Sequence, residues 1–355
     1  MSGMAWARFL AEALPTTRNH WVPGLISIVI PVFNEEKGLG LLVNRLLPVL
    51  EGLNRPFEVV FVNDGSRDGS LEALRLLASR DPRLKLVSFS RNFGKECAIA
   101  AGLAYATGDA VILMDSDLQH PPEVIGEFMA HWRDGYQIVY GQRLDRRTDG
   151  PVRRIMSKLF YRLFHLLTKT DLPRNAGDFR LLDRKAVDAL NRIGERARYN
   201  NGLYTWIGFR SIGVPYSVGE RAEGASKWSP RRLMHFAIDG LTSFSNVPLK
   251  VWSYLGLLVS MIAVAYAFVF FVKTLIFGVD VPGFPTLVIS IMLLSGAQLI
   301  SLGVLGEYLA RVYDEVKARP LYIVAEEIGF GDDAAGDRPK ASAENVGRPS
   351  STAAG

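Results

Sequence analysis

Short apolar runs alternate with stretches of helical periodicity through the first third of the chain. The apolar runs, at residues 25–32, 57–63, 84–90 and 110–115, are rich in β-branched residues and short enough to be strands. The stretches between them, at residues 35–50, 70–79 and 95–106, repeat apolar positions at helical spacing. Continuous apolar strands separated by helices are typical of a parallel sheet that helices cover on both faces. The pattern predicts an α/β domain, which we place at residues 25–230 after an N-terminal arm at 1–24.

Two longer apolar runs lie near the C-terminus. Residues 252–272 and 284–306 contain no charged residue, and each is long enough to cross a bilayer as a helix. A pair of core helices in a soluble protein is the alternative, but buried helices seldom extend so far without a polar face. The runs therefore predict a two-helix transmembrane hairpin within residues 251–308, followed by a C-terminal segment at 309–355.

The flanks of the predicted hairpin are basic. Lys and Arg residues precede it between 231 and 250 and follow it between 311 and 319, so the positive-inside rule places both flanks in the cytoplasm. Residues 1–24 lack the sustained apolar core of a secretory signal. We therefore expect the α/β domain to stay on the cytoplasmic side of the membrane.

Two further segments are predicted to lie at the membrane surface. Residues 153–169 interleave basic and apolar side chains, as an interfacial amphipathic helix does, although an ordinary helix with a solvated basic face has the same pattern. Residues 231–250 are expected to form a second interfacial helix that leads into the first span. Beyond residue 330 the composition turns to Gly, Asp, Ala, Ser and Pro, which predicts disorder.

The composition narrows the function classes. A single cysteine, Cys97, excludes an intramolecular disulfide, and the five histidines lack the paired spacing of a zinc site. The net charge of +5 is local, because residues 143–174 hold nine Lys or Arg against three Asp. A positive charge excess confined to one segment argues against nucleic acid as a partner. The basic segment therefore needs a separate explanation.

Polar residues follow three of the predicted strands, at 31–36, 63–66 and 115–122. In wound sheets ligands bind at the carboxyl ends of the strands, so these residues are expected to share one crevice. Asp115, Asp117 and Gln119 follow the fourth strand. Oxygen ligands with room left for phosphate oxygens suit Mg²⁺ or Mn²⁺ bridging to a diphosphate. A solvated acidic turn would have the same residues, but the position after a strand of a wound sheet favours the metal.

Neither G-x-G-x-x-G after the first strand nor G-x-x-x-x-G-K-[ST] is present, which argues against a dinucleotide oxidoreductase and a P-loop enzyme. Residues 63–66 could form a simple tight turn. At a strand end, however, the carboxylates of Asp64 and Glu35 could accept hydrogen bonds from a base or ribose. Lys95, at a predicted helix start, could meet a base or phosphate or be a solvated first-turn residue, and the sequence leaves both open.

Several motifs together resemble a known family. IPVFNEE, FVNDGS, FSRNFGKE, DSDLQHPPE, NAGDFRLLDR and LGVLGEYLARVYDEVKARPLYI, spread between residues 26 and 323, look like those of the polyprenyl-phosphate glycosyltransferases. These are inverting enzymes with a GT-A nucleotide-sugar-binding, Rossmann-like domain. They include dolichol-phosphate mannose synthases and, most similar here, bactoprenol glucosyltransferases. The resemblance also implies a homotetramer in a bacterial inner membrane.

The resemblance implies roles for individual residues. Nucleotide-sugar binding falls on Pro31, Val32, Glu35, Asp64, Lys95 and Asp115, metal binding on Asp115, Asp117 and Gln119, and catalysis on Asp117, Asp178 and Arg180. Asp178 could be a general base or could orient a sugar hydroxyl or pair with Arg180, and these readings remain open. The chain departs from the commonest glucosyl pattern at His120, where an Asp often follows the Gln, and at residues 226–228, where subfamilies differ.

A lipid phosphate acceptor would explain the basic segment. Cationic side chains beside a membrane can capture such a phosphate, and the candidates are Arg143, Arg153, Arg154, Lys158 and Lys227. The expected reaction is transfer of a hexose, foremost glucose from UDP-glucose, to undecaprenyl phosphate with a divalent metal. Transfer of mannose, GlcNAc or aminoarabinose is the close alternative. A processive polysaccharide synthase is less favoured because Q-x-x-R-W is missing, and a non-catalytic scaffold because the acidic set is intact.

Overall fold

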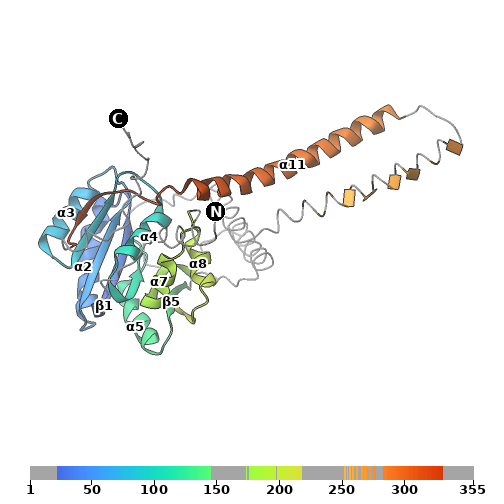
Figure 1. Ribbon diagram of the computed structural model, residues 1–355. Coiled ribbons are helices and arrows are strands. Elements are labelled where there is room, and N and C mark those ends of the chain that lie inside the picture. Colours follow the sequence, from blue (N-terminus) through green and yellow to red (C-terminus); the bar gives the residue numbers. More distant parts are fainter. Residues whose placement is uncertain are drawn as a thin grey trace, which may run out of the picture. The chain divides into compact units, whose positions relative to one another are not determined.

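The computed structural model describes residues 22–144, 173, 176–196, 198–217 and 283–330, and scattered positions between 252 and 276 (Figure 1). The chain divides into two compact units. The described residues up to 217 and those from 320 to 330 belong to the first, which we call the catalytic unit. The second contains the described residues from 252 to 319. Each unit is described by itself below.

The catalytic unit is built on an eight-stranded sheet in the order β7-β5-β6-β4-β1-β2-β3-β8. The strands are β1 (Val22–Val32), β2 (Phe57–Asn63), β3 (Leu84–Phe89), β4 (Gly108–Leu113), β5 (Ile138–Arg143), β6 (Ala176–Asp183), β7 (Ser211–Tyr216) and β8 (Val324–Ile328). The helices of this unit are α2 (Glu36–Glu51), α3 (Ser70–Arg80), α4 (Lys95–Tyr105), α5 (Ile125–Arg133), α7 (Arg184–Asn191) and α8 (Asn200–Trp206), with a short 3₁₀ turn, η1 (Pro122–Val124), before α5.

The four strands and three helices predicted from the first third of the sequence are confirmed as β1 to β4 and α2 to α4. Strand β1 pairs in parallel with both β2 and β4, and β2 pairs in parallel with β3. This is the wound parallel sheet that the apolar runs predict. Both flanks depart from it, because β6 and β8 run antiparallel to their neighbours β4, β5 and β3. The result is a mixed sheet with a parallel centre.

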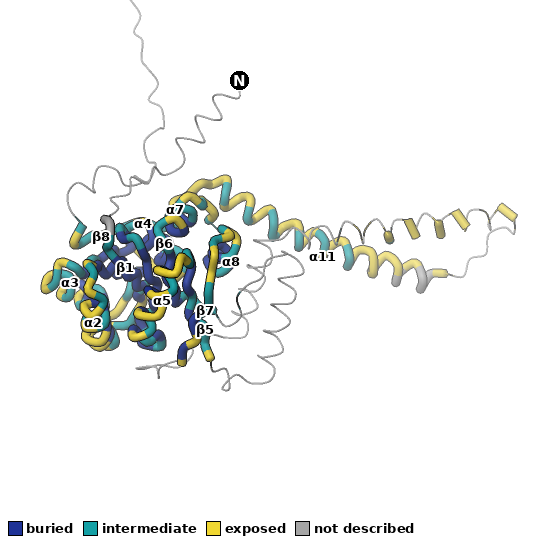
Figure 2. Tube along the Cα trace, turned by 90° about the horizontal axis from the view of Figure 1, so that it is seen from below, coloured by how far each residue is buried: buried dark blue, intermediate teal, exposed yellow. Residues whose placement is uncertain are grey.

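The core lies between the sheet and its helices, as the burial pattern in Figure 2 shows. Helix α2 turns one apolar face inward, formed by Leu39, Leu42, Val43, Leu46 and Leu50. Helix α4 lies so close to β1 that a Cβ atom at Gly102 would be 2.1 Å from Cγ1 of Val29. Only glycine allows this approach, which holds the C-terminal half of α4 against the central strand. The start of α4 carries Lys95.

The reversed strand β6 brings a second polar segment to the carboxyl ends of the parallel strands. Leu113, at the end of β4, is in register with Arg180 of β6. Because β6 runs antiparallel to β4, its first residues extend past this pair at the edge where β4 ends. Asp178 therefore comes to the same edge as Asp115.

A final strand enters the catalytic unit after the apolar helix. Residues 320–330, which we call the return segment, include β8, and β8 pairs antiparallel with β3 at the edge of the sheet. A partly exposed ion pair between Arg75 of α3 and Glu326, with nitrogen and oxygen 2.7 Å apart, adds a weaker contact to this strand. This strand differs from the sequence prediction, in which residues 309–355 form a separate C-terminal segment.

The second unit contains the helix α11 (Phe284–Lys317), of 34 residues. Its stretch Leu293–Lys317 is long and apolar enough to cross a membrane, and none of its apolar window is buried. The predicted span at 284–306 is therefore helical, but the helix continues past it through residues 307–317. Good helix formers and an ion pair between Glu307 and Arg311 at 3.2 Å extend the helix beyond the apolar run.

The rest of the predicted membrane part is only partly described. Among the described positions from 252 to 276, all are helical and most are exposed. This agrees with a helix in the first apolar run, but the structure describes only one helix with a candidate span. The predicted interfacial helices at 153–169 and 231–250, the arm at 1–21 and the tail after 330 lie outside the described residues.

Candidate active site

The loops after β1 and β2 are joined by hydrogen bonds at the carboxyl edge of the sheet. The backbone N–H of Asn34 donates to Oγ of Ser66 at 3.1 Å, and Oδ1 of Asn34 accepts from the N–H of Arg67 at 2.8 Å. Asn34 has a φ of +56°, a left-handed conformation that Asn tolerates better than most residues. The N–H of Glu35 donates to Oγ of Ser70 at 2.9 Å, which ties Glu35, a few residues after Pro31 and the buried Val32, to the start of α3.

Asp64 ties the loop after β2 to the loop after β3. Its Oδ1 accepts from the N–H of Phe93 at 2.7 Å, and its Oδ2 accepts from the N–H of Gly94 at 3.0 Å and from Nδ2 of Asn92 at 2.9 Å. The side chain is 3% exposed, and burial raises its pKa despite these hydrogen bonds. Asp64 thus organises the 91–94 loop with the same two oxygens that the sequence suggested could accept hydrogen bonds from a base or ribose.

A close backbone contact reinforces this arrangement. Gly65 has a φ of +64°, and a Cβ atom there would lie 2.3 Å from the carbonyl carbon of Arg91. Only glycine fits both the conformation and the contact. The residues after β2 are closed by a hydrogen bond from the N–H of Ser66 to Oδ1 of Asn63, 3.2 Å long, and they support the neighbouring loop.

Lys95 joins two acidic residues at the centre of the edge. Its Nζ lies 2.6 Å from Oδ1 of Asp115 and 2.7 Å from Oδ2 of Asp178. Asp115 follows β4 and Asp178 belongs to β6, so one ammonium gathers carboxylates from two strands. Lys95 is a first-turn residue whose side chain is 45% exposed, and its ammonium is also held by both acids, so both sequence interpretations of Lys95 remain open.

The charges of this triad support one another. Burial would raise the pKa of Asp115, but the Lys95 ammonium lowers this pKa to about 2. Desolvation would lower the pKa of Lys95, but the carboxylates of Asp115 and Asp178 raise it above its ordinary value. Asp115 and Lys95 are therefore both ionised at neutral pH. The other oxygen of Asp178, Oδ1, is buried and has no hydrogen-bond partner among the described residues.

A further acid lies behind Lys95. Oε2 of Glu96 accepts from the N–H of Asn200 at 3.1 Å, which ties α4 to α8. Burial, followed by repulsion from Asp178, raises the pKa of Glu96 to about 7. Glu96 is thus close to half protonated at neutral pH, unlike Asp115.

Arg180 is buried beneath the triad rather than exposed in the crevice. It is 3% exposed, and its guanidinium donates to the carbonyl of Gly177 and, at 2.8 Å, to Oδ1 of Asn201. The same group lies 3.7 Å from the centroid of the Tyr204 ring. These contacts favour a role in shaping the start of β6, and the ion pair of Asp178 is made with Lys95 instead.

His120 lies beneath Asp115. Its Nδ1 accepts from the N–H of Asp115 at 3.1 Å, and its ring stacks on Phe179 with centroids 4.8 Å apart. The side chain is 1% exposed, and burial lowers its pKa, so the ring is neutral. A neutral ring that accepts at Nδ1 carries its proton on Nε2, which lies 3.9 Å from Oδ2 of Asp115 and makes no hydrogen bond among the described residues.

Arg143 is the one acceptor candidate that the structure describes. Its Nε donates to the hydroxyl of Tyr216 at 3.1 Å, at the ends of the parallel strands β5 and β7. The Tyr216 ring packs edge-on against both His120 and Phe179. Arg143 is therefore connected to the acidic centre through aromatic packing. The remaining candidates, Arg153, Arg154, Lys158 and Lys227, lie outside the described residues.

The described residues contain no group of three or more His, Cys, Asp or Glu side chains that could hold a metal by themselves. The predicted ligands Asp115, Asp117 and Gln119 follow β4 in one turn, where Oδ1 of Asp117 accepts from the N–H of Gln119 at 3.1 Å. Two carboxylates and an amide are a donor set that fits Mg²⁺ or Mn²⁺ only if substrate oxygens complete the shell. The unpartnered Oδ1 of Asp178 is a further acceptor beside them.

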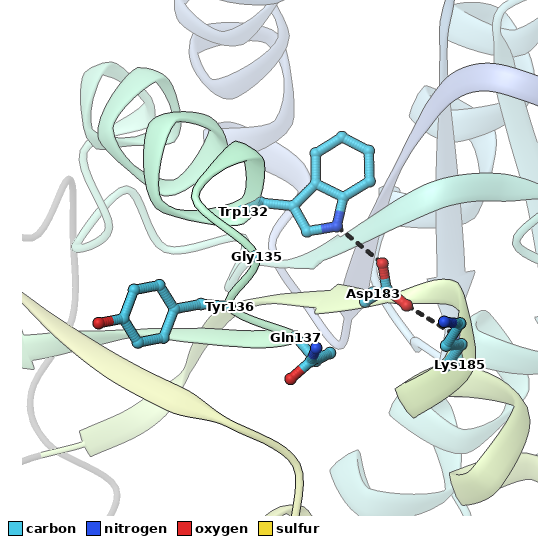
Figure 3. Close-up of a pocket in the computed structure, with 6 residues that line it drawn as sticks. All are labelled: Trp132, Gly135, Tyr136, Gln137, Asp183 and Lys185. Carbon is cyan, nitrogen blue, oxygen red and sulfur yellow. Dashed lines mark hydrogen bonds between the residues drawn. The ribbon is translucent and has the colours of Figure 1, made fainter.

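A small pocket lies at the other edge of the sheet (Figure 3). Trp132 and Tyr136 help to line it, and Nε1 of Trp132 donates to Oδ2 of Asp183 at 2.9 Å. Asp183 is in register with Ala110 near the start of β4, away from Asp115. The volume of about 80 Å³ is well below the ~300 Å³ at which ligand pockets begin. This pocket is not the site of a nucleotide sugar.

The fold and the acidic edge define a nucleotide-sugar-dependent transferase with a GT-A, Rossmann-like domain. Residues 27–190 match the model of glycosyl transferase family 2, and the chain belongs to this family. It is a glycosyltransferase.

Its relatives extend over both units. An uncharacterized glycosyltransferase of Synechocystis is 48% identical, covering 86% of this chain and 96% of that protein. The bactoprenol glucosyl transferase of Shigella phage SfII is 43% identical over 84% and 97% of the two chains. A prophage bactoprenol glucosyl transferase homolog of Escherichia coli is 42% identical over 84% and 98%. Among solved structures, glucosyl-3-phosphoglycerate synthase of Mycobacterium tuberculosis is a remote match, with a TM-score of 0.43 and 19% identity over 66% of this chain and 80% of that chain.

Several residues that build the site were not anticipated from the sequence. Asn92, Asn200 and Tyr204 are ordinary polar or aromatic residues in their local context, and only the fold brings them to Asp64, Glu96 and Arg180. For Glu96 a signal existed, since it adjoins Lys95 at a helix start. The long-range contacts that bury it have no trace in local sequence.

Proposed function

We propose that this glycosyltransferase transfers glucose from UDP-glucose to undecaprenyl phosphate, with inversion, at the cytoplasmic face of a bacterial inner membrane. The proposal rests on two ion pairs at the carboxyl edge of the sheet. They join Lys95 to Asp115 and to Asp178. The names of relatives 42–43% identical along nearly their whole length support the sugar and the lipid. The same reaction with another nucleotide sugar is the alternative that the departures at His120 and 226–228 keep open.

On the donor side, Pro31, Val32, Glu35 and Lys95 would line the nucleotide, and Asp64 would act through the loop it holds. Asp115, Asp117 and Gln119 would hold a divalent metal, Mg²⁺ or Mn²⁺, with the diphosphate completing its ligand shell. When bound, the metal would neutralise charge on the leaving nucleoside diphosphate. The proposal is supported by the donor set of the 115–119 turn and by the short pairing between Lys95 and Asp115.

On the acceptor side, an oxygen of the lipid phosphate would attack the anomeric carbon as the nucleoside diphosphate leaves. A phosphate monoester has a second pKa of about 6, so this oxygen is largely ionised at neutral pH and needs no strong base. Asp178 therefore fits an organising role. Lys95 holds its Oδ2, which would fix the carboxylate where it could orient a sugar hydroxyl.

The membrane part of the proposal rests on α11 and the basic segment. The exposed apolar stretch of α11 would span the bilayer together with a helix in residues 252–272, giving a two-helix hairpin with both flanks cytoplasmic. Arg143, with Arg153, Arg154, Lys158 and Lys227, would capture the lipid phosphate near the surface. The family resemblance further suggests a homotetramer.

Purified full-length enzyme incubated with undecaprenyl phosphate and a panel of nucleotide sugars, with lipid products read by mass spectrometry, tests the proposal. We expect a hexosyl product from UDP-glucose, abolished by a metal chelator. A product from another nucleotide sugar alone would favour the alternative, and no lipid-linked product from any donor would overturn the acceptor assignment. Replacing Arg153, Arg154 and Lys158 by Gln should raise the KM for the lipid more than that for the donor.

A further inference from the structure

The return segment makes two contacts with the end of β3, where the 91–94 loop begins. The ring of Tyr322 stacks on Phe89 with centroids 4.9 Å apart and planes 13° from parallel. The N–H of Ser90 donates to the carbonyl of Ile323 at 3.0 Å. These contacts involve a ring and a backbone group, so they fix both the side chain of Phe89 and the path of the chain after it.

From Phe89 the contacts continue into the loop. Phe89 packs edge-on against Phe93, with centroids 5.7 Å apart. The N–H of Phe93 is the closest donor to the Asp64 carboxylate, and Lys95 lies two residues further along. Phe89 is buried, so its ring shifts little without displacing the partly buried Tyr322 and Phe93 that it contacts, and the position of Tyr322 thereby constrains the start of α4. Lys95 is the residue there that joins Asp115 and Asp178.

The return segment makes further contacts with β3 and with the end of α4. Strand β8 pairs with β3, Glu327 accepts from the Tyr105 hydroxyl, and Lys85 lies 5.2 Å from the centroid of the Phe330 ring. The pairing shifts register between Ser88 and Phe89, at the point where Tyr322 stacks. The segment can therefore act as a fixed platform for the loop.

We infer that Tyr322 is a positioning residue of the donor site, which holds the 91–94 loop and, through it, Lys95. The residues directly after the apolar helix are then a working part of the nucleotide-sugar side rather than a tail. The inference rests on the proposed function for the identity of the donor, but the geometry of the loop can be tested without turnover. A purely structural role, in which Tyr322 only covers the edge of the sheet, predicts a different outcome.

Three substitutions separate these roles. Tyr322→Leu keeps apolar volume without a stacking ring, Tyr322→Phe keeps the ring without the hydroxyl, and Glu326→Gln weakens a partly exposed ion pair on the same strand. Burial raises the pKa of Tyr322 to about 12, so the hydroxyl carries no charge that Phe would remove. Amide hydrogen exchange of Phe93 and Gly94 reports directly on the loop. Steady-state kinetics then separates the KM for the donor from that for the lipid.

We expect Tyr322→Leu to speed exchange of these two amides and to raise the donor KM about tenfold, with the lipid KM unchanged. Tyr322→Phe and Glu326→Gln should match the wild type in both measurements. Unchanged exchange in Tyr322→Leu would overturn the inference, and so would faster exchange with an unchanged donor KM. Equal effects from Tyr322→Leu and Glu326→Gln would favour the purely structural role and overturn it too. If the wild type does not use UDP-glucose, the proposed function fails, while the exchange measurement still decides the role of Tyr322.

Discussion

Oδ2 of Asp178 lies 2.7 Å from Nζ of Lys95, which joins the first turn of α4 to the start of β6. The same ammonium pairs with Asp115 after β4. One cation therefore sets the distance between two acids that the sequence places far apart. Without it, two carboxylates would face each other in a partly desolvated site, where like charges repel strongly.

Replacing Lys95 tests this relationship. Lys95→Met should lower kcat about a hundredfold, because it leaves both acids unpaired and removes a positive charge beside the diphosphate. Lys95→Arg keeps the charge with a different shape and should retain part of the activity. Steady-state kinetics on both variants checks the order. Equal activity of Lys95→Met and wild type would show that the triad is incidental.

Removing the charge of Asp178 distinguishes a base from an organiser. Since the acceptor phosphate ionises near pH 6, a base would matter most below that pH, whereas an organiser matters at every pH. Asp178→Asn should therefore show a similar rate deficit at about pH 6 and about pH 8.5, at saturating donor and metal. Recovery of full activity at the higher pH would identify Asp178 as the proton acceptor instead.

The metal proposal has a test at Asp117. Asp117→Asn discards a negative ligand where leaving-group charge develops and should remove most turnover, on the order of a hundredfold or more. Calorimetric titration with Mn²⁺ and UDP should show weaker metal binding in the variant. Near-normal turnover with an unchanged metal requirement would contradict this assignment.

Local sequence patterns predicted the residues at the centre of the site. They did not predict the residues that hold those central residues in place. The apolar runs predicted β1 to β4, and with them the shared edge for Asp64, Asp115 and Asp117, because parallel strands must end together. Glu96, Asn200 and Tyr322 depend on contacts between distant segments. Their roles follow from how β6, α8 and β8 pack, which no local periodicity encodes.

The raised pKa of Glu96 predicts how stability depends on pH. This pKa rises from 4.5 to about 7 on folding, so the folded state holds the proton more tightly. The resulting stabilisation is fully present below pH 4.5 and is lost as the pH rises through about 7. Its size is at most about 3 kcal/mol. Glu96→Gln keeps the acceptor for Asn200 without the titration, so in detergent its Tm should exceed that of the wild type at pH 8 and match it at low pH. Parallel Tm curves for the two proteins would refute this.

His120 offers the last prediction, because its two contacts with the site can be separated. The imidazole accepts the N–H of Asp115 at 3.1 Å and stacks on Phe179. His120→Phe keeps a ring for the stack but leaves the buried N–H of Asp115 unpaired, which costs about 1–3 kcal/mol. His120→Asn places an oxygen near the position of Nδ1 and gives up the stack, worth about 0.5–1.5 kcal/mol. Because the hydrogen bond orients Asp115, we expect turnover to fall further in His120→Phe than in His120→Asn, by about tenfold. Turnover measured beside thermal unfolding distinguishes the two contacts, and the reverse order of activity would mean that ring packing, not the hydrogen bond to Asp115, is what the reaction requires of His120.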